Sequence, residues 1–172
     1  MIERHNNVEP TTVLFVSASS AFVEIAREFY GRDDRTIDFH TVADSDDTLA
    51  FLDRREPYAG APRPSLVIVD VRGRTNGIEI LEAIVEDPSR RRIPVIVLGD
   101  ATQATSSSTN GSDDTNRAAR TSGSNASRFY DSYANAYVHV PDDRESFENV
   151  LERLTQFWIS TARLPNRDDR VR

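Results

Sequence analysis

The stretch Leu66-Val67-Ile68-Val69-Asp70 decides the fold, because it carries an uninterrupted apolar run into an aspartate. A run of this length indicates a strand that is buried on both faces, as in a parallel sheet covered by helices. In α/β sheets of that kind, functional side chains lie beyond the carboxyl ends of the strands. Asp70 is therefore the first candidate for a functional residue.

Similar apolar segments before and after this one extend the pattern. We expect further strands at residues 12–16, 37–42, 94–98 and 136–140. Between most of them, apolar residues recur at the three-and-four spacing of amphipathic helices. Strands that alternate with helices predict an α/β fold, a doubly wound five-stranded parallel sheet in the order 2-1-3-4-5.

The helix starts are predicted from capping residues. Ser19-Ser20 precedes the first apolar stripe and is expected to cap the first helix. Ser45 or Asp46 is expected to cap the second helix, which should bury Leu49 and Leu52.

The length of 172 residues suits one domain with appendages. We expect an N-terminal tail at 1–10, the domain at 11–165 and a C-terminal tail at 166–172. Residues 100–128 are rich in Thr, Ser, Asn, Gly and Asp and contain almost no large apolar residue. Such a segment buries too little surface to offset its ordering entropy, which predicts a disordered insertion between strands four and five.

The formal net charge is -7, and every basic residue is arginine because the chain contains no lysine. This composition is typical of proteins from salt-loving cells (halophiles), where acidic surfaces favour solubility. An acidic chain repels the phosphate backbone, so no nucleic-acid partner is expected. The absence of cysteine excludes disulfides and thiolate metal sites. The charged N-terminus and the lack of a long apolar segment predict a cytoplasmic protein with no membrane partner.

Several dispersed motifs accompany the strands. They are Ala61-Pro62-Arg63-Pro64 with Leu66 to Asp70, Asp87-Pro88 with Arg91 to Leu98, Ala134 to Val138 with Pro141, and Phe157-Trp158 with Leu164-Pro165. With these motifs the chain resembles the response-regulator receiver family, over roughly residues 12–165. More narrowly, it is similar to the stand-alone receivers that partner phytochrome-type histidine kinases. The resemblance implies a flavodoxin-like fold and a role in two-component, or phosphorelay, signal transduction.

The resemblance also assigns roles to individual positions. In the family, the aspartate that matches Asp70 accepts a phosphoryl group from a kinase histidine. An acidic pair that holds Mg²⁺ is replaced here by Ser17-Ala18, a switch hydroxyl by Gly99, and a lysine by Val140. In the family, these groups orient the transferred phosphoryl group and neutralise its charge. Without them, a phosphorylated Asp70 would present roughly two negative charges to an uncompensated pocket.

The leading hypothesis is therefore a pseudo-receiver: a protein-protein interaction module that works without phosphorylation, has no enzymatic activity and needs no cofactor. The alternative is a conventional response regulator, phosphorylated on Asp70 by a histidine kinase. In that case Asp100 and Ser17 would supply an improvised Mg²⁺ site. An enzyme or nucleotide binder is not favoured, because no glycine-rich loop follows the first strand.

Asp70 also has a structural interpretation. A carboxylate at a strand end accepts hydrogen bonds from backbone N–H groups of the following loop, here residues 72–76. The side chain of Arg72 or of Arg74 is a second candidate partner for it.

The aromatic residues near the C-terminus suggest contacts. Phe129, Tyr130 and Tyr133 are expected to dock as a remnant of a fourth helix. The last helix is expected to run to about residue 163, and the resemblance places a homodimer contact at Phe157 and Trp158. The expected protein partner is a sensor histidine kinase or another signalling protein.

Overall fold

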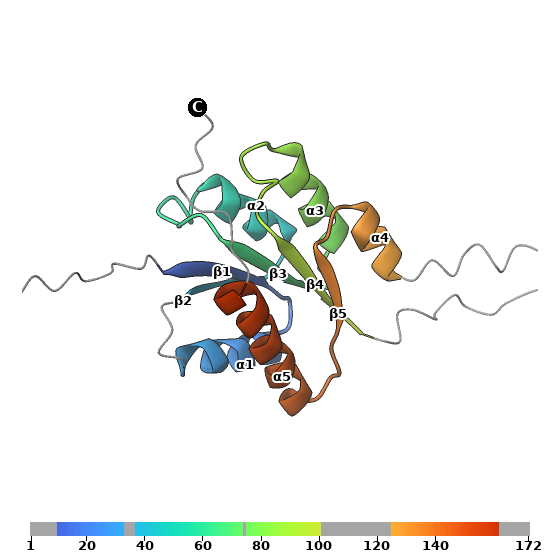
Figure 1. Ribbon diagram of the computed structural model, residues 1–172. Coiled ribbons are helices and arrows are strands. Elements are labelled where there is room, and N and C mark those ends of the chain that lie inside the picture. Colours follow the sequence, from blue (N-terminus) through green and yellow to red (C-terminus); the bar gives the residue numbers. More distant parts are fainter. Residues whose placement is uncertain (1–9, 33–36, 74, 101–124, 162–172) are drawn as a thin grey trace, which may run out of the picture.

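The computed structural model describes residues 10–32, 37–73, 75–100 and 125–161 (Figure 1). Its five strands form one parallel sheet in the order β2-β1-β3-β4-β5, so the expected fold is confirmed. The strands are β1 Thr11–Val16, β2 Ile37–Val42, β3 Leu66–Asp70, β4 Val95–Gly99 and β5 Ala136–His139. The helices are α1 Ser20–Gly31, α2 Ser45–Asp53, α3 Gly77–Glu86, α4 Asn125–Asp131 and α5 Arg144–Leu154.

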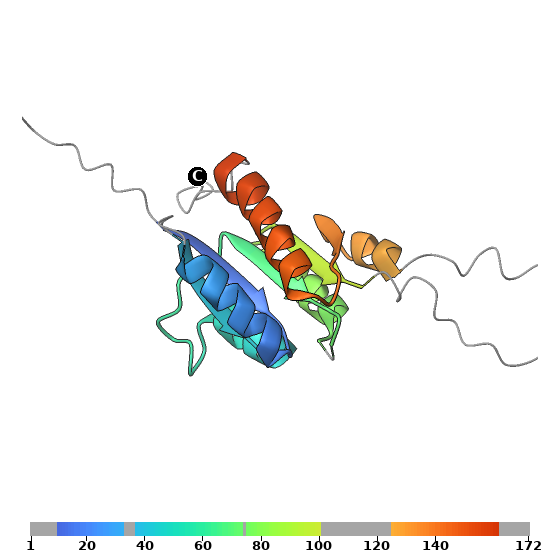
Figure 2. The ribbon, with the colours of Figure 1, turned by 90° about the horizontal axis from the view of Figure 1, so that it is seen from below.

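The helices cover both faces of the sheet. Helices α1 and α5 lie on one face, and α2, α3 and α4 lie on the other (Figures 1 and 2). Because side chains alternate along a strand, each strand feeds both cores. In β3, Leu66 and Ile68 pack with α1 and α5, whereas Val67 and Val69 pack with α2 and α3.

This alternation also determines which face of the sheet the last residue of each strand belongs to. Asp70 continues the series of Leu66 and Ile68, so it belongs to the α1–α5 face. In β4, Val95 and Val97 pack with the helices of the other face. Gly99 continues that series and therefore belongs to the face of α3 and α4.

Helix capping agrees with the sequence in α1 and differs in α2. The side chain of Ser19 caps α1, as expected, by accepting a hydrogen bond from the N–H of Phe22. Helix α2 is capped by Asp44, one residue before the expected Ser45, because the Asp44 carboxylate reaches the N–H of Asp47 at 2.9 Å. With that start, Phe51 is the large residue that α2 buries, while Leu49 and Leu52 are only partly buried.

The expected insertion is only partly described. Residues 101–124 lie outside the described part of the chain, but 125–128 open helix α4 and so do not belong to a disordered segment. In this helix Phe129 is buried, as expected for a docked residue. The expectation was wrong for Tyr133, which lies beyond the end of α4 and is 69% exposed. The ring of Tyr130 is 52% exposed, because this short helix turns only Phe129 inward, and the Tyr130 hydroxyl alone reaches β5.

The last helix changes its winding before it ends. From Thr155 to Thr161 it continues as a π-helix, beginning where the hydroxyl of Thr155 donates to the carbonyl of Leu151 and contacts the hydroxyl of Tyr30. Its expected end near residue 163 lies outside the described residues. In the parts of the chain that the structure describes, no helix has the length and apolar character needed to cross a membrane.

Candidate functional site

Asp70 lies at the carboxyl end of β3, between β1 and β4. The residue is only 2% exposed, although it is an acid at the edge of the sheet. A buried carboxylate is tolerated only when its charge is compensated and its oxygens are hydrogen-bonded. The groups around Asp70 therefore determine what this site can do.

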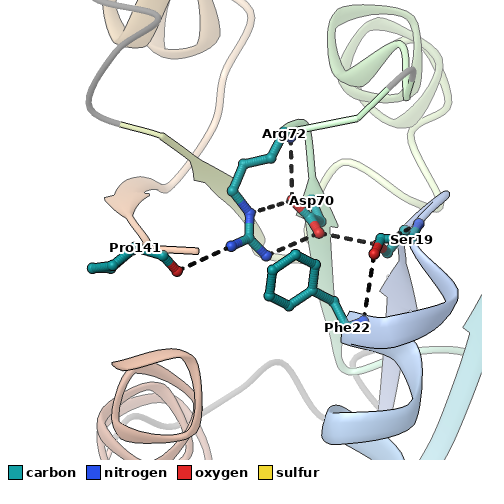
Figure 3. Close-up of polar contacts among 6 residues, drawn as sticks. Ser19, Phe22, Asp70, Arg72 and Pro141 are labelled. Atoms are coloured by element: carbon teal, nitrogen blue, oxygen red, sulfur yellow. Dashed lines mark hydrogen bonds and ion pairs between the residues drawn. The ribbon is translucent and has the colours of Figure 1, made fainter. Parts of the chain in front are cut away.

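Arg72 compensates the charge of Asp70. Its Nε lies 2.8 Å from one carboxylate oxygen and a terminal nitrogen lies 3.1 Å from the other, a bidentate pair (Figure 3). The backbone N–H of Arg72 donates to the same carboxylate at 3.2 Å. Both structural expectations for Asp70, a backbone contact and an arginine partner, are thus met by Arg72, while Arg74 lies outside the described residues.

Two phenylalanine rings enclose the guanidinium of Arg72. Its central carbon lies 3.8 Å from the ring centroid of Phe22 in α1 and 5.2 Å from that of Phe147 in α5. A third nitrogen donates to the backbone carbonyl of Pro141 at 3.4 Å. With a side chain that is 5% exposed, Arg72 is a buried cation held by contacts from three separate segments.

Ser17 and Ala18 follow β1 and have different surroundings. The buried hydroxyl of Ser17 donates to Asp70 at 3.0 Å and accepts a hydrogen bond from the N–H of Ser19 at 3.2 Å. Ala18 is exposed. Of this pair, only Ser17 contacts Asp70, as a hydrogen-bond donor.

Gly99 and Val140 follow β4 and β5. Val140 is buried in the core with Phe147, so a hydrophobic side chain stands where the resemblance implies an ammonium group. Its N–H donates to the carbonyl of Gly99 at 2.8 Å. Beside Gly99, the ring of Tyr137 fills the space that a side chain at position 99 would need.

Asp100 faces a different environment from Asp70. It lines a cavity of about 230 Å³ together with Thr75, Gly99 and Tyr137. Its negative charge, added to the larger effect of burial, raises the pKa of Tyr137 above its ordinary value.

The residues around Asp70 do not fit a divalent cation. Mg²⁺ requires several oxygen ligands in a tight octahedron. Both oxygens of Asp70 already accept hydrogen bonds from Arg72, whose positive charge opposes a second cation at the same place. Across the described residues, no cluster of three or more His, Cys, Asp or Glu side chains is placed to hold a metal ion.

Sequence reasoning missed four contributors to this site: Phe22, Phe147, Pro141 and Tyr137. Phe147 lies on the last helix, far from Asp70 in the sequence, and the carbonyl of Pro141 leaves no trace in the sequence. A signal for Phe22 exists, since it lies one turn into α1 and α1 begins directly beyond β1. The contact of Tyr137 with Gly99 required the strand register.

Comparison with known proteins finds relatives of the same fold. No family model matches the chain. The response regulator Rcp1 of Synechocystis sp. is 25% identical over 159 residues, covering 91% of this chain and 94% of the relative. The crystal structure of the phosphorylated cyanobacterial phytochrome response regulator RcpA superposes with a TM-score of 0.71 at 25% identity, over 91% of this chain and 99% of that one.

The chain is thus similar in sequence and fold to response regulators. A Mn²⁺-bound form of Rcp1 has the same fold, with a TM-score of 0.67 at 24% identity over 91% of this chain and all of that one. Metal binding is thus a property of that relative. In the receiver-like site described here, an arginine side chain contacts the carboxylate that ends β3.

Proposed function

We propose that this chain is a degenerate receiver of two-component signalling that acts through protein contacts and does not use Asp70 as a phosphoryl acceptor. The observation that supports the proposal is the bidentate pair between Asp70 and Arg72, buried beneath Phe22 and Phe147. Both carboxylate oxygens are engaged, so neither is free to attack a phosphoryl donor without moving the arginine.

Charge balance supports the same conclusion. A phosphorylated aspartate would carry about two negative charges where Arg72 supplies one positive charge. Phosphoryl transfer also relies on a metal ion and positioned cations that neutralise the transferred group. Val140 supplies no such charge, and Ser17 supplies a single hydroxyl that Asp70 already occupies.

Labelling with acetyl phosphate tests the proposal directly. The purified protein, held at high salt to suit its acidic composition, should take up no label with or without Mg²⁺, and Asp70→Asn should behave in the same way. A Mg²⁺-dependent response regulator labelled in parallel provides the positive control. Label that depends on Asp70 would overturn the proposal and establish the conventional response regulator in its place.

Calorimetry with Mg²⁺ provides a second, independent test. We expect no saturable heat beyond that of dilution, because the guanidinium of Arg72 occupies the carboxylate. A saturable heat that disappears in Asp70→Asn would contradict this expectation. The matched control is Asp46→Asn, an exposed acid in the first turn of α2 that changes the net charge by the same amount.

The proposed setting is the cytoplasm, and the proposed partner is a sensor histidine kinase or another signalling protein. The choice of partner rests on RcpA, which is named as a cyanobacterial phytochrome response regulator. Affinity capture at high salt with the wild-type chain should recover the partner equally well with Asp70→Asn as bait. Capture that is lost in Asp70→Asn would show that the partner depends on the acceptor position.

A homodimer through Phe157 and Trp158 is a further part of the proposal. Phe157 is 56% exposed and its ring packs edge-on against Trp158, which is half-buried against the α1–α5 core. Sedimentation of wild type and Phe157→Ser should therefore differ, with the variant shifted toward monomer. Identical sedimentation would exclude Phe157 from the contact.

A further inference from the structure

A pair of aromatic rings lies between two glycines on the α3–α4 face of the sheet. Phe129 of α4 and Tyr137 of β5 stack with ring centroids 5.5 Å apart and an angle of 24° between their planes. Gly77 begins α3 and Gly99 ends β4. All four residues line the same cavity of about 230 Å³.

Gly99 leaves room for the ring of Tyr137. A Cβ atom added at position 99 would lie far inside van der Waals contact with the hydroxyl oxygen and ring carbons of Tyr137. Rotation of the ring about its Cβ–Cγ bond does not relieve this overlap, because the hydroxyl oxygen and the ring carbon that bears it lie on that axis. Any other residue at position 99 would therefore force Tyr137 to turn about its Cα–Cβ bond, which separates it from Phe129.

Gly77 plays a smaller part for the other ring. A Cβ atom at position 77 would lie 2.6 Å from a methyl group of Val71, closer than real contacts allow, and 3.0 Å from the ring of Phe129, tighter than most real contacts. Gly77 thus lets α4 approach the start of α3. The ring of Tyr137 thus occupies a position that only glycine leaves open, and the ring of Phe129 lies tightly against Gly77.

The stack also carries the attachment of α4. This helix has seven residues, too few to be stable alone in water. Its buried anchor is Phe129, and the hydroxyl of Tyr130 accepts the backbone N–H of Tyr137 at 3.1 Å. The packing of Phe129 therefore depends on where the ring of Tyr137 lies, and the hydrogen bond of Tyr130 adds a contact with the backbone of β5.

From these contacts we infer that the two glycines and the two stacked rings form a fixed latch that holds α4 on the sheet in one arrangement, whatever happens at Asp70. The latch, defined as Gly77, Gly99, Phe129 and Tyr137, needs no ligand and no charge change to close. It goes beyond the proposed function by explaining how the α4–β5 surface is kept in a single state. It does not require that Asp70 lack phosphoryl chemistry.

Hydrogen exchange in Gly99→Ala tests the latch. Displacement of Tyr137 should release α4, so the amides of residues 132–134, which donate to carbonyls of α4, should exchange at least about tenfold faster, while those of β1 and β3 keep their protection. Gly60→Ala is the matched control, because a Cβ atom there meets nothing within 4 Å. Unchanged exchange of the 132–134 amides in Gly99→Ala would overturn the inference.

A double-mutant cycle keeps the test decisive if Gly99→Ala folds poorly. In a Tyr137→Ala background the added methyl at position 99 has no ring to displace, so Gly99→Ala should cost no further stability there. Equal costs in the two backgrounds would show that the glycine does not act through Tyr137.

Whether the latch is independent of Asp70 can be measured separately. Asp70→Asn should leave the exchange rates of the 132–134 amides unchanged, and a change as large as that in Gly99→Ala would contradict the latch. Acetyl phosphate labelling reports only on the proposed function. The two ideas can therefore fail separately.

Discussion

The two ends of this site, at Asp70 and at Gly99, are closed in different ways. Asp70 faces α1 and α5, and its closure is electrostatic, a buried pair with Arg72 under two aromatic rings. Gly99 faces α3 and α4, and its closure is steric, the ring of Tyr137 in the space of an absent side chain. The last residues of the neighbouring strands β3 and β4 thus face opposite sides of one sheet.

The two ends are thus closed by different physical means. An arginine two residues beyond Asp70 supplies a positive charge there, whereas at Gly99 the volume of an aromatic side chain fills the space. A buried ion pair contributes little net stability but is costly to break from one side. A steric closure depends on shape alone. Variants at the two ends should therefore differ in how much stability they lose and in how strongly that loss depends on charge.

The largest effect is expected for Arg72→Ala. It leaves the carboxylate of Asp70 buried without its counter-charge and removes the contacts with Phe22 and Phe147, which should cost about 3–5 kcal/mol in the free energy of unfolding. Urea denaturation monitored by the single tryptophan measures this. A loss below about 1 kcal/mol, the range of exposed ion pairs, would show that the pair is not buried in solution.

The double variant Asp70→Leu with Arg72→Met serves as the control. Replacing both members of a buried pair by apolar residues is often neutral, so most of the loss should be recovered. A double variant as unstable as Arg72→Ala would assign the loss to packing instead of charge.

A smaller effect is expected for Ser17→Ala. Its hydroxyl donates to the buried carboxylate of Asp70, and hydrogen bonds to charged groups contribute about 1.5–3 kcal/mol. The same denaturation experiment measures the change, with exposed Ser20→Ala at the start of α1 as the control. If the two serines behave alike, the contact with Asp70 does not stabilise the fold.

The smallest effect is a pH dependence at the Gly99 end. Burial, and then the charge of Asp100, raise the pKa of Tyr137 above its ordinary value of 10. The pKa of Tyr137 is higher in the folded state than in the unfolded state. The contribution of Tyr137 to folding stability is therefore complete below the unfolded-state pKa and is lost as pH rises through the folded-state pKa. Tyr137→Phe should therefore reduce the loss of stability at alkaline pH, as measured by thermal unfolding between neutral and alkaline buffers.

Part of that alkaline loss should survive in Tyr137→Phe. The pKa of Tyr58 is raised in the same direction, by burial and by the nearby Asp47 and Asp44. An alkaline profile that is identical in wild type and Tyr137→Phe would show that the ring at Gly99 is not buried against Asp100.

Much of the fold could be predicted from the sequence, because apolar runs such as 66–69 and caps such as Ser19 act locally. The strand order followed from the same pattern. Asp44 was missed as a cap because neighbouring Ser45 and Asp46 are equally good capping residues, and only the backbone angles distinguish them. Tyr133 was misjudged because it lies beyond the end of α4, and the extent of a short helix depends on how it docks.

The site could be predicted only in part. The position of Asp70 followed from the end of its strand, and the partner Arg72 was one of two local alternatives. Phe22 and Phe147 lie far from Arg72 in the chain, so their enclosure of the guanidinium depends on how α1 and α5 pack. Long-range packing of this kind leaves no periodic signal in a single sequence.

The hydrogen bond from Tyr137 to Tyr130 has a consequence for self-association. β5 is an edge strand, and exposed N–H groups on an edge offer a template for pairing with another chain. The phenol oxygen of Tyr130 occupies one of these donors. Tyr130→Phe would uncover it and so favour aggregation through sheet extension, a defect that would appear as light scattering on storage well before any loss of helix content.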